Sequence, residues 1–144
     1  MAAPARLAAL LVVPVIALTA CGQTTKNSAV NFRGEQKAVA QAIDDLQNAG
    51  SKGDAAKICS KLLTPALVTK IRQASNGACD KALKDALADV DRNAFGMDVK
   101  KITITGTAAT AMVRSNAGSN HRTDTLGLEK VGGAWKIASL GAGG

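Results

Sequence analysis

The sequence predicts an α+β domain in which N-terminal helices pack on an antiparallel sheet of about four strands. Between residues 34 and 90, apolar residues recur at the three- and four-residue spacing that indicates amphipathic helices. After Phe95-Gly96, apolar and polar residues instead alternate, which is typical of half-buried strands. Helices therefore come first and strands last, an order that favours one α+β unit over alternating βαβ units.

The first helix is predicted to begin near Gly34 and to stop in the breaker segment at residues 50–54. Its apolar positions follow the pattern i, i+3, i+4 and i+7, which places them on one face: Val39, Ala42, Ile43 and Leu46. Its polar positions are expected to point away from that face: Asp44, Asp45 and Gln47.

Three shorter helices are expected before the sheet. Asp54 is a capping residue for the second helix, whose apolar positions are Ile58, Cys59 and Leu62. Thr64-Pro65 reads as N-cap and first turn of the third, which carries Leu67, Ile71 and Ala74 and stops at Asn76-Gly77. The fourth has the clearest amphipathic pattern of the chain, on Cys79, Ala82, Leu83, Ala86, Leu87 and Val90.

Four short strands are predicted from the alternating residues. Their apolar members are Ile102 and Ile104, then Ala109, Ala111 and Val113, then Leu126 and Leu128, and finally Trp135 and Ile137. Gly106 is expected to turn the first pair, and Gly132-Gly133 is a two-residue hairpin signal for the last pair. Between the middle strands, Asn116–Arg122 is predicted to be a polar loop.

The N-terminus resembles the export signal of bacterial lipoproteins. Leu18-Thr19-Ala20-Cys21 is similar to a lipobox, and this resemblance implies cleavage before Cys21 and a lipid on its sulfur. Residues 1–20 would then be a signal peptide, residues 21–33 a lipidated tether, and residues 34–144 a domain on the extracytoplasmic face of a cell membrane. The alternative is an uncleaved anchor, but the apolar stretch Leu7–Ala20 is shorter than a helix that spans a bilayer.

The chain is basic, with a formal net charge of +7. Such a charge suits anionic lipid headgroups or acidic wall polymers, although most of it is scattered singly, as on an ordinary solvated surface. No basic run is interleaved with aromatic residues, and we expect no nucleic-acid partner.

Two cysteines remain once Cys21 is assigned to the lipid. Cys59 and Cys79 are open to three interpretations, namely a disulfide, free thiols or a metal site. A metal site needs three or four ligands, and His121 is the one histidine that is available to join them. An even pair in a compartment that permits disulfides favours the bridge, and we expect neither a metal nor a cofactor.

A set of short motifs carries a family resemblance over about residues 35–140. The motifs are Gly50-x-x-Gly53-Asp54, Cys59, Leu62-Leu63-Thr64-Pro65, Cys79 and Gly132-Gly133-x-Trp135-Lys136-Ile137. They resemble small secreted actinobacterial lipoproteins of the NTF2-like superfamily. The resemblance implies a curved sheet that wraps a long N-terminal helix into a cone, often around an apolar pocket. The superfamily includes isomerases, dehydratases, lumazine-binding-like domains and members without known activity, so the fold does not determine the function. This chain lacks the early strand pair of many members.

No acid–base constellation stands out. His121 lies in the predicted polar loop, where an exposed histidine is the ordinary case. Asp44 and Asp45 are adjacent on a helix, about 100° apart, so they do not act as a pair on one substrate. Arg114 and Asp124 are expected to form a cross-strand ion pair. We therefore predict no catalytic residues.

A ligand site is expected between the first helix and the concave side of the sheet. The expected residues are Val39, Ile43, Leu46, Ile104, Ala109, Ala111 and Leu126. The two small alanines leave room either for an apolar ligand or for close packing of the helix. Three functions remain open: a module that binds a small apolar or amphipathic ligand or an envelope protein, an enzyme of isomerase or hydrolase type, and a structural envelope protein. The first is the prediction, because the sequence offers no convincing perturbed carboxylate or histidine.

Overall fold

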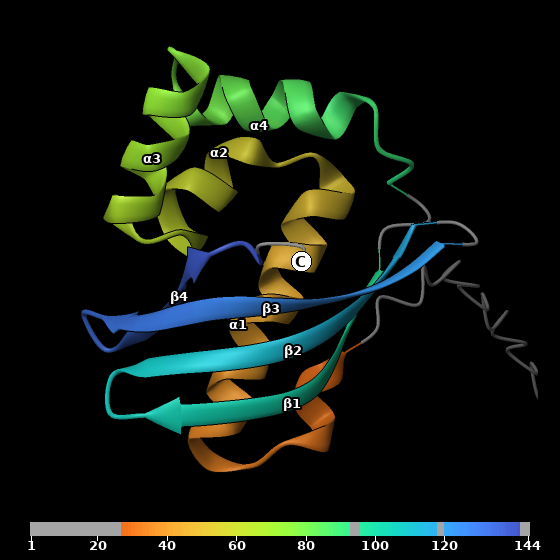
Figure 1. Cartoon of the computed structure of the whole chain (residues 1–144), viewed down its shortest axis with the longest axis vertical. Helices are drawn as coiled ribbons and strands as arrows, with labels where there is room; N and C mark the ends of the chain where they lie inside the picture. Colours follow the sequence, from red (N-terminus) through yellow and green to blue (C-terminus); the bar gives the residue numbers. More distant parts are fainter. Residues whose placement is uncertain (1–26, 93–95, 118–119, 142–144) are drawn as a thin grey trace, which may run out of the picture.

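A computed structural model describes residues 27–92, 96–117 and 120–141, and the expected signal peptide and Cys21 lie outside them. The described residues form a four-stranded antiparallel sheet with a long helix across one face and a group of shorter helices at one end (Figure 1). This arrangement confirms the predicted α+β class.

The long helix α1 runs over Gly34–Lys52 and starts where the sequence predicts. The four apolar positions expected on one face are all buried. The helix ends at Gly53, whose φ of 68° is left-handed, a conformation that glycine adopts without steric cost. The break in the pattern at residues 50–54 therefore marks the C-terminal end of α1.

The next helices form the group at the end of the sheet. Helix α2 (Ala55–Lys57) is capped by the Asp54 side chain and continues into the π-helix η2 (Ile58–Leu62). Helix α3 (Pro65–Ser75) begins with the expected cap, in which Thr64 Oγ1 accepts from the N–H of Leu67 at 3.2 Å. Helix α4 (Cys79–Ala88) ends before Val90, and Ala74 of α3 is exposed rather than buried.

The strands are β1 (Gly96–Thr105), β2 (Ala108–Ala117), β3 (Asn120–Val131) and β4 (Ala134–Ser139), paired in sequence order. Gly132 and Gly133 both have positive φ in the two-residue turn, as the hairpin signal predicts. The predicted polar loop at Asn116–Arg122 is wrong, because Asn116 pairs with His121 and the strands continue beyond them. Polar residues do not exclude a strand here, because one face of an antiparallel sheet can lie in water.

A polar contact joins the start of α1 to the far hairpin of the sheet. The Glu35 carboxylate accepts from Lys130 Nζ and from Trp135 Nε1, each at 2.7 Å. These hydrogen bonds, of which the one from Lys130 has the larger effect, hold the pKa of Glu35 below its ordinary value of 4.5. A lowered pKa contributes stability above the ordinary value, and this stability is lost as the pH falls through the folded-state pKa.

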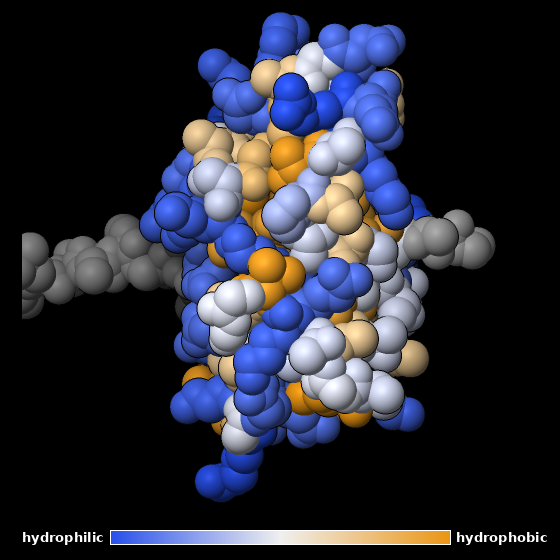
Figure 2. Space-filling view, turned by 90° about the vertical axis from the view of Figure 1, so that its left-hand side faces the viewer, coloured by the Kyte–Doolittle hydropathy of each residue, from blue (hydrophilic) through white to orange (hydrophobic). Residues whose placement is uncertain are grey.

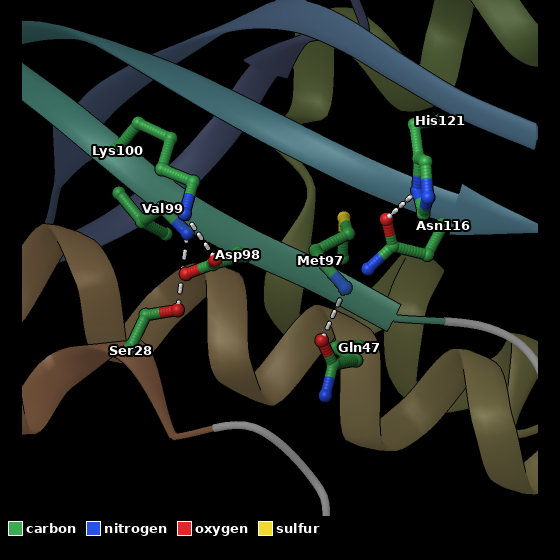
Figure 3. A network of polar contacts seen from close by, with 8 residues as sticks. All are labelled: Ser28, Gln47, Met97, Asp98, Val99, Lys100, Asn116 and His121. Carbon is green, nitrogen blue, oxygen red and sulfur yellow. Dashed lines mark hydrogen bonds and ion pairs between the residues drawn. The ribbon is translucent and has the colours of Figure 1, made fainter.

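Side chains satisfy the exposed backbone of edge strand β1. The N–H of Met97 donates to Gln47 Oε1, and the N–H of Val99 donates to Ser28 Oγ at 3.1 Å (Figure 3). The Gln36 side chain also donates to the carbonyl of Ile102. At the opposite edge, the N–H of Thr64 donates to the carbonyl of Ile137 in β4 at 2.8 Å. Both edges of the sheet are therefore partly covered, which protects them from pairing with another chain.

Two polar residues of α1 contradict the expectation that they face solvent. Asp44 and Gln47 are only 3% and 2% exposed. The two carboxylate oxygens of Asp44 accept from the N–H groups of Ser28 and Ala29, at 3.0 and 2.9 Å. These residues open the 3₁₀ turn η1 (Ser28–Asn31), so part of the expected tether at residues 21–33 is packed on the domain.

Burial disfavours the charged form of Asp44. It raises the pKa of the carboxyl above its ordinary value of 3.8, although the hydrogen bonds from the N–H groups of Ala29 and Ser28 lower this pKa in part. A raised pKa favours the protonated form in the fold, and the stability linked to that proton is lost as the pH rises through the folded-state pKa. The carboxyl is kept there because it satisfies two backbone donors that would otherwise lie buried without partners.

We expect Asp44→Ala to lower the free energy of unfolding by about 2–4 kcal/mol, since it leaves two buried N–H groups without an acceptor. Asp45→Ala is the matched control, because Asp45 is half-buried and its carboxylate accepts from Gln41 at the surface. Urea unfolding of both variants checks this expectation. Equal losses from the two substitutions would show that the Asp44 contacts contribute little.

The Cys59–Cys79 disulfide is present in the structure and confirms the expected pairing. It joins η2 to the first residue of α4. Both elements belong to the helical group at one end of the sheet. Cys79 is the buried residue of α4, so the bond fixes this helix at its N-terminal end.

Replacing both cysteines by alanine is expected to cost about 3 kcal/mol, because the bond closes a loop between residues separated by 20 positions. Thermal unfolding of the double variant, compared with the wild-type protein with and without reductant, measures the loss. If reduction leaves the melting temperature unchanged, the bridge does not stabilise the fold.

Candidate functional site

The candidate site is an apolar cavity of about 170 Å³ between the C-terminal half of α1, the helical group and the sheet. Its lining contains no polar side chain. The lining residues are Leu46, Gly50, Ile58, Leu63, Leu83, Leu87, Met97, Leu126 and Leu140. A cavity of this size and composition holds apolar groups more readily than water.

The cavity exists because α4 does not pack fully onto the core. Although this helix has the clearest amphipathic pattern, Leu83 and Leu87 are only half-buried and face the cavity. Gly50 lies on the opposite wall, where α1 offers no side chain to fill the space. The disulfide holds α4 at its first residue, and the part of the helix beyond it forms one wall of the cavity.

A second hollow of about 250 Å³ adjoins the first. The two share the lining residues Met97, Leu126 and Leu140, so they lie side by side. Unlike the cavity, the second hollow has polar lining residues, namely Ser115, Arg122 and Asp124. The arrangement is an apolar interior with a polar opening at the end of the sheet where β2 and β3 meet.

The polar residues of the opening are linked to one another. Arg122 Nε donates to Asp124 Oδ1 at 2.8 Å, and Ser115 Oγ donates to Asp124 Oδ2 at 3.4 Å. The expected ion pair between Arg114 and Asp124 is therefore wrong. In the observed register Asp124 faces Val113, on the inner side of the sheet, whereas Arg114 faces Thr123 on the outer side.

The structure places two of the seven residues expected to bind a ligand at the cavity and the other five elsewhere. Leu46 and Leu126 line the cavity. Four others are buried in the core between α1 and the sheet, where they pack closely: Val39, Ile43, Ala109 and Ala111. Ile104 is half-buried beside Ala109 near the end of β1. The small alanines thus allow close packing of α1, which is the alternative that the sequence left open.

Sequence reasoning did not identify the residues that come together from distant segments. Met97, Leu83 and Leu140 lie on β1, α4 and the C-terminal segment, and only the tertiary fold brings them to one cavity. Leu140 is 47% exposed in the structure. A single apolar residue near the end of a sequence is common and gives no signal of a binding site by itself.

The candidate acid–base groups lie away from the cavity. His121 is exposed on β3, and its Nδ1 lies 2.6 Å from Asn116 Oδ1 (Figure 3). Asp44 has a raised pKa, but both of its oxygens bind backbone N–H groups and it does not line the cavity. Across the described residues, no cluster of three or more histidine, cysteine or acidic side chains is arranged to hold a metal ion.

Other surfaces offer weaker sites. A hollow of about 390 Å³ lies beside the turn that ends α3, but its lining residues are all exposed, so it is open to solvent. On the side viewed in Figure 2, apolar residues form small groups among hydrophilic ones, and hydrophilic residues dominate the top. Among the helices of the described ranges, none combines the length and apolar character that crossing a bilayer requires.

The long helix across a four-stranded antiparallel sheet has the predicted NTF2-like α+β fold. The chain belongs to the family described as putative lumazine-binding, whose model matches residues 34–140. A solved structure of an NTF2-like protein of unknown function from Shewanella baltica OS155 is 21% identical, with a TM-score of 0.48. The match covers 73% of this chain and 89% of that one. No curated protein matches the sequence.

Proposed function

We propose that this protein is a membrane-anchored extracytoplasmic lipoprotein that binds a small apolar or amphipathic molecule without chemically changing it. The observation that carries the binding function is the apolar cavity between α1, α4 and the sheet. The family description, putative lumazine-binding, supports ligand binding as the general role.

The composition of the site favours an aliphatic ligand. Burial of apolar surface stabilises a complex by about 25 cal/mol per Å², and this cavity has only aliphatic and methionine side chains to offer. Lumazine is a flat heterocycle, and aromatic side chains are the partners on which such rings stack. Trp135 lies instead beside Glu35, outside the lining of the cavity. We therefore expect aliphatic molecules to bind more tightly than lumazine.

Filling the cavity tests this function. We expect Leu83→Phe to weaken binding of a fluorescent fatty acid by about tenfold or more, because the larger ring occupies space between α4 and the sheet. Leu83 is half-buried, so the substitution is expected to leave the melting temperature unchanged or higher. Displacement titration and thermal unfolding measure the two quantities.

Ala86→Phe is the matched control, because it adds the same ring to an exposed position of α4 that does not line the cavity. This control should bind the fatty acid like the wild-type protein. If the wild-type protein binds neither fatty acid nor lumazine at micromolar concentration, the cavity is a packing defect. A structural role or an envelope-protein partner then replaces ligand binding as the better interpretation.

The proposed location rests on Leu18-Thr19-Ala20-Cys21 and is supported by the disulfide. Disulfides persist in oxidising compartments outside the cytoplasm. The first described residue is Asn27, and five residues lie between it and Cys21 in the sequence. Such a segment reaches about 20 Å when fully extended, which would keep the domain near the membrane. Of the net charge of +7, Arg6 lies in the segment that would be removed, and the remaining positive charge suits the anionic surface there.

Cys21→Ala is expected to abolish lipidation and to shift the protein from the membrane fraction to the soluble fraction or to an unprocessed precursor. Fractionation, with mass spectrometry of the mature N-terminus, follows the change. Cys59→Ala is the control, since it removes a different cysteine and should leave membrane association intact. Recovery of unmodified Cys21 from membrane-extracted protein would contradict the lipid anchor.

A further inference from the structure

We propose that the bound molecule is an amphiphile with an anionic head, and that Arg122 binds this head while the aliphatic tail occupies the apolar cavity. The inference deepens the proposed function and depends on it. It assigns separate roles to the two hollows, which differ in chemistry although they share a wall.

Adjacency of the two hollows is the first step. Met97, Leu126 and Leu140 line both, and Leu140 is 47% exposed, so a molecule that lies across these shared residues contacts both hollows. Each hollow alone is smaller than the roughly 300–1,000 Å³ of pockets that enclose drug-sized ligands. A ligand that fills the site therefore has an apolar part in one hollow and a polar part in the other.

The second step is the orientation of Arg122. Its Nε donates to Asp124 Oδ1 at 2.8 Å, and Ser115 holds the other oxygen of the same carboxylate. A guanidinium has five N–H donors in a planar fork, and the terminal nitrogens have no ion-pair partner within the described ranges. Asp124 thus fixes the fork, and the remaining donors match the geometry of a carboxylate or phosphate.

The acidic neighbour does not oppose this assignment. Asp124 is already compensated by Arg122, and its side chain is 18% exposed whereas that of Arg122 is 62% exposed. The guanidinium is therefore the more accessible charge at the opening. A cationic head would meet this guanidinium first, and a neutral head would gain no charge-assisted hydrogen bond.

The size of the apolar cavity limits the tail. The cavity of about 170 Å³ is small beside pockets that enclose drug-sized ligands, so a long tail does not fit inside it. Medium-length chains fit this volume, whereas long chains would extend past Leu140 into solvent. Octanoate is accordingly the probe of choice for a head at Arg122.

The experiment compares ligands that share a tail and differ in the head: octanoate, octanol and octylamine. Native mass spectrometry and calorimetry on the purified protein should rank octanoate first. Arg122→Gln is expected to weaken octanoate binding about tenfold, the effect of losing one charge-assisted hydrogen bond, and to leave octanol binding unchanged. Arg114→Gln is the control, because it removes the same charge from the exposed outer face of β2.

The possible results separate this inference from the function on which it rests. If octanoate and octanol bind equally well, or if Arg114→Gln and Arg122→Gln have the same effect, the specific head site is overturned while apolar binding stands. If octylamine binds most tightly, Asp124 rather than Arg122 recognises the head. If none of the three binds, the proposed function itself fails. If octanoate does bind most tightly, a comparison with octyl phosphate distinguishes a preference for phosphate heads from a preference for carboxylate heads.

Discussion

The structure depends on hydrogen bonds between polar side chains of α1 and the backbone of the segments beside it. Gln36, Asp44 and Gln47 are spaced at i, i+8 and i+11, and they form one polar stripe along the helix. Asp44 and Gln47 are buried, whereas Gln36 is exposed near the N-terminal end. They bind the N–H groups or carbonyls of β1 and η1, which have no partner strand at that edge. An unpaired buried backbone group costs about as much as the loss of a hydrogen bond, so these contacts determine where α1 lies.

A helix fixed in this way divides the interior into two parts. Toward its N-terminal half, α1 packs directly on the sheet, where the Ala109 and Ala111 side chains are small enough to permit close approach. Toward its C-terminal half, Gly50 has no side chain, and Leu83 and Leu87 of α4 are only half-buried and line the cavity. The same elements therefore produce a dense core at one end and a cavity at the other, and the proposed ligand site requires no separate domain.

The end of the sheet gives the cavity its chemical asymmetry. Inward-facing positions alternate along each strand, so the inner face of β3 continues from Leu128 through Leu126 to Asp124 and Arg122. Helices cover Leu128 and Leu126, whereas Asp124 and Arg122 lie beyond the helices and line the second hollow. A single strand thus supplies both an apolar wall and a charged opening, a combination that suits amphiphiles better than wholly apolar or wholly polar molecules.

The sequence by itself determined the α+β class, the start of α1, the Thr64 cap, the hairpin at Gly132-Gly133 and the strand alternation. These are local consequences of residue spacing and backbone preference. It did not determine that Asp44 and Gln47 turn inward, that Asp124 pairs with Arg122, or that α4 stands over a cavity. Those features depend on which backbone groups lack partners, on strand register and on how far a helix can approach the sheet. Only the tertiary structure decides them, because each joins residues that are distant along the chain.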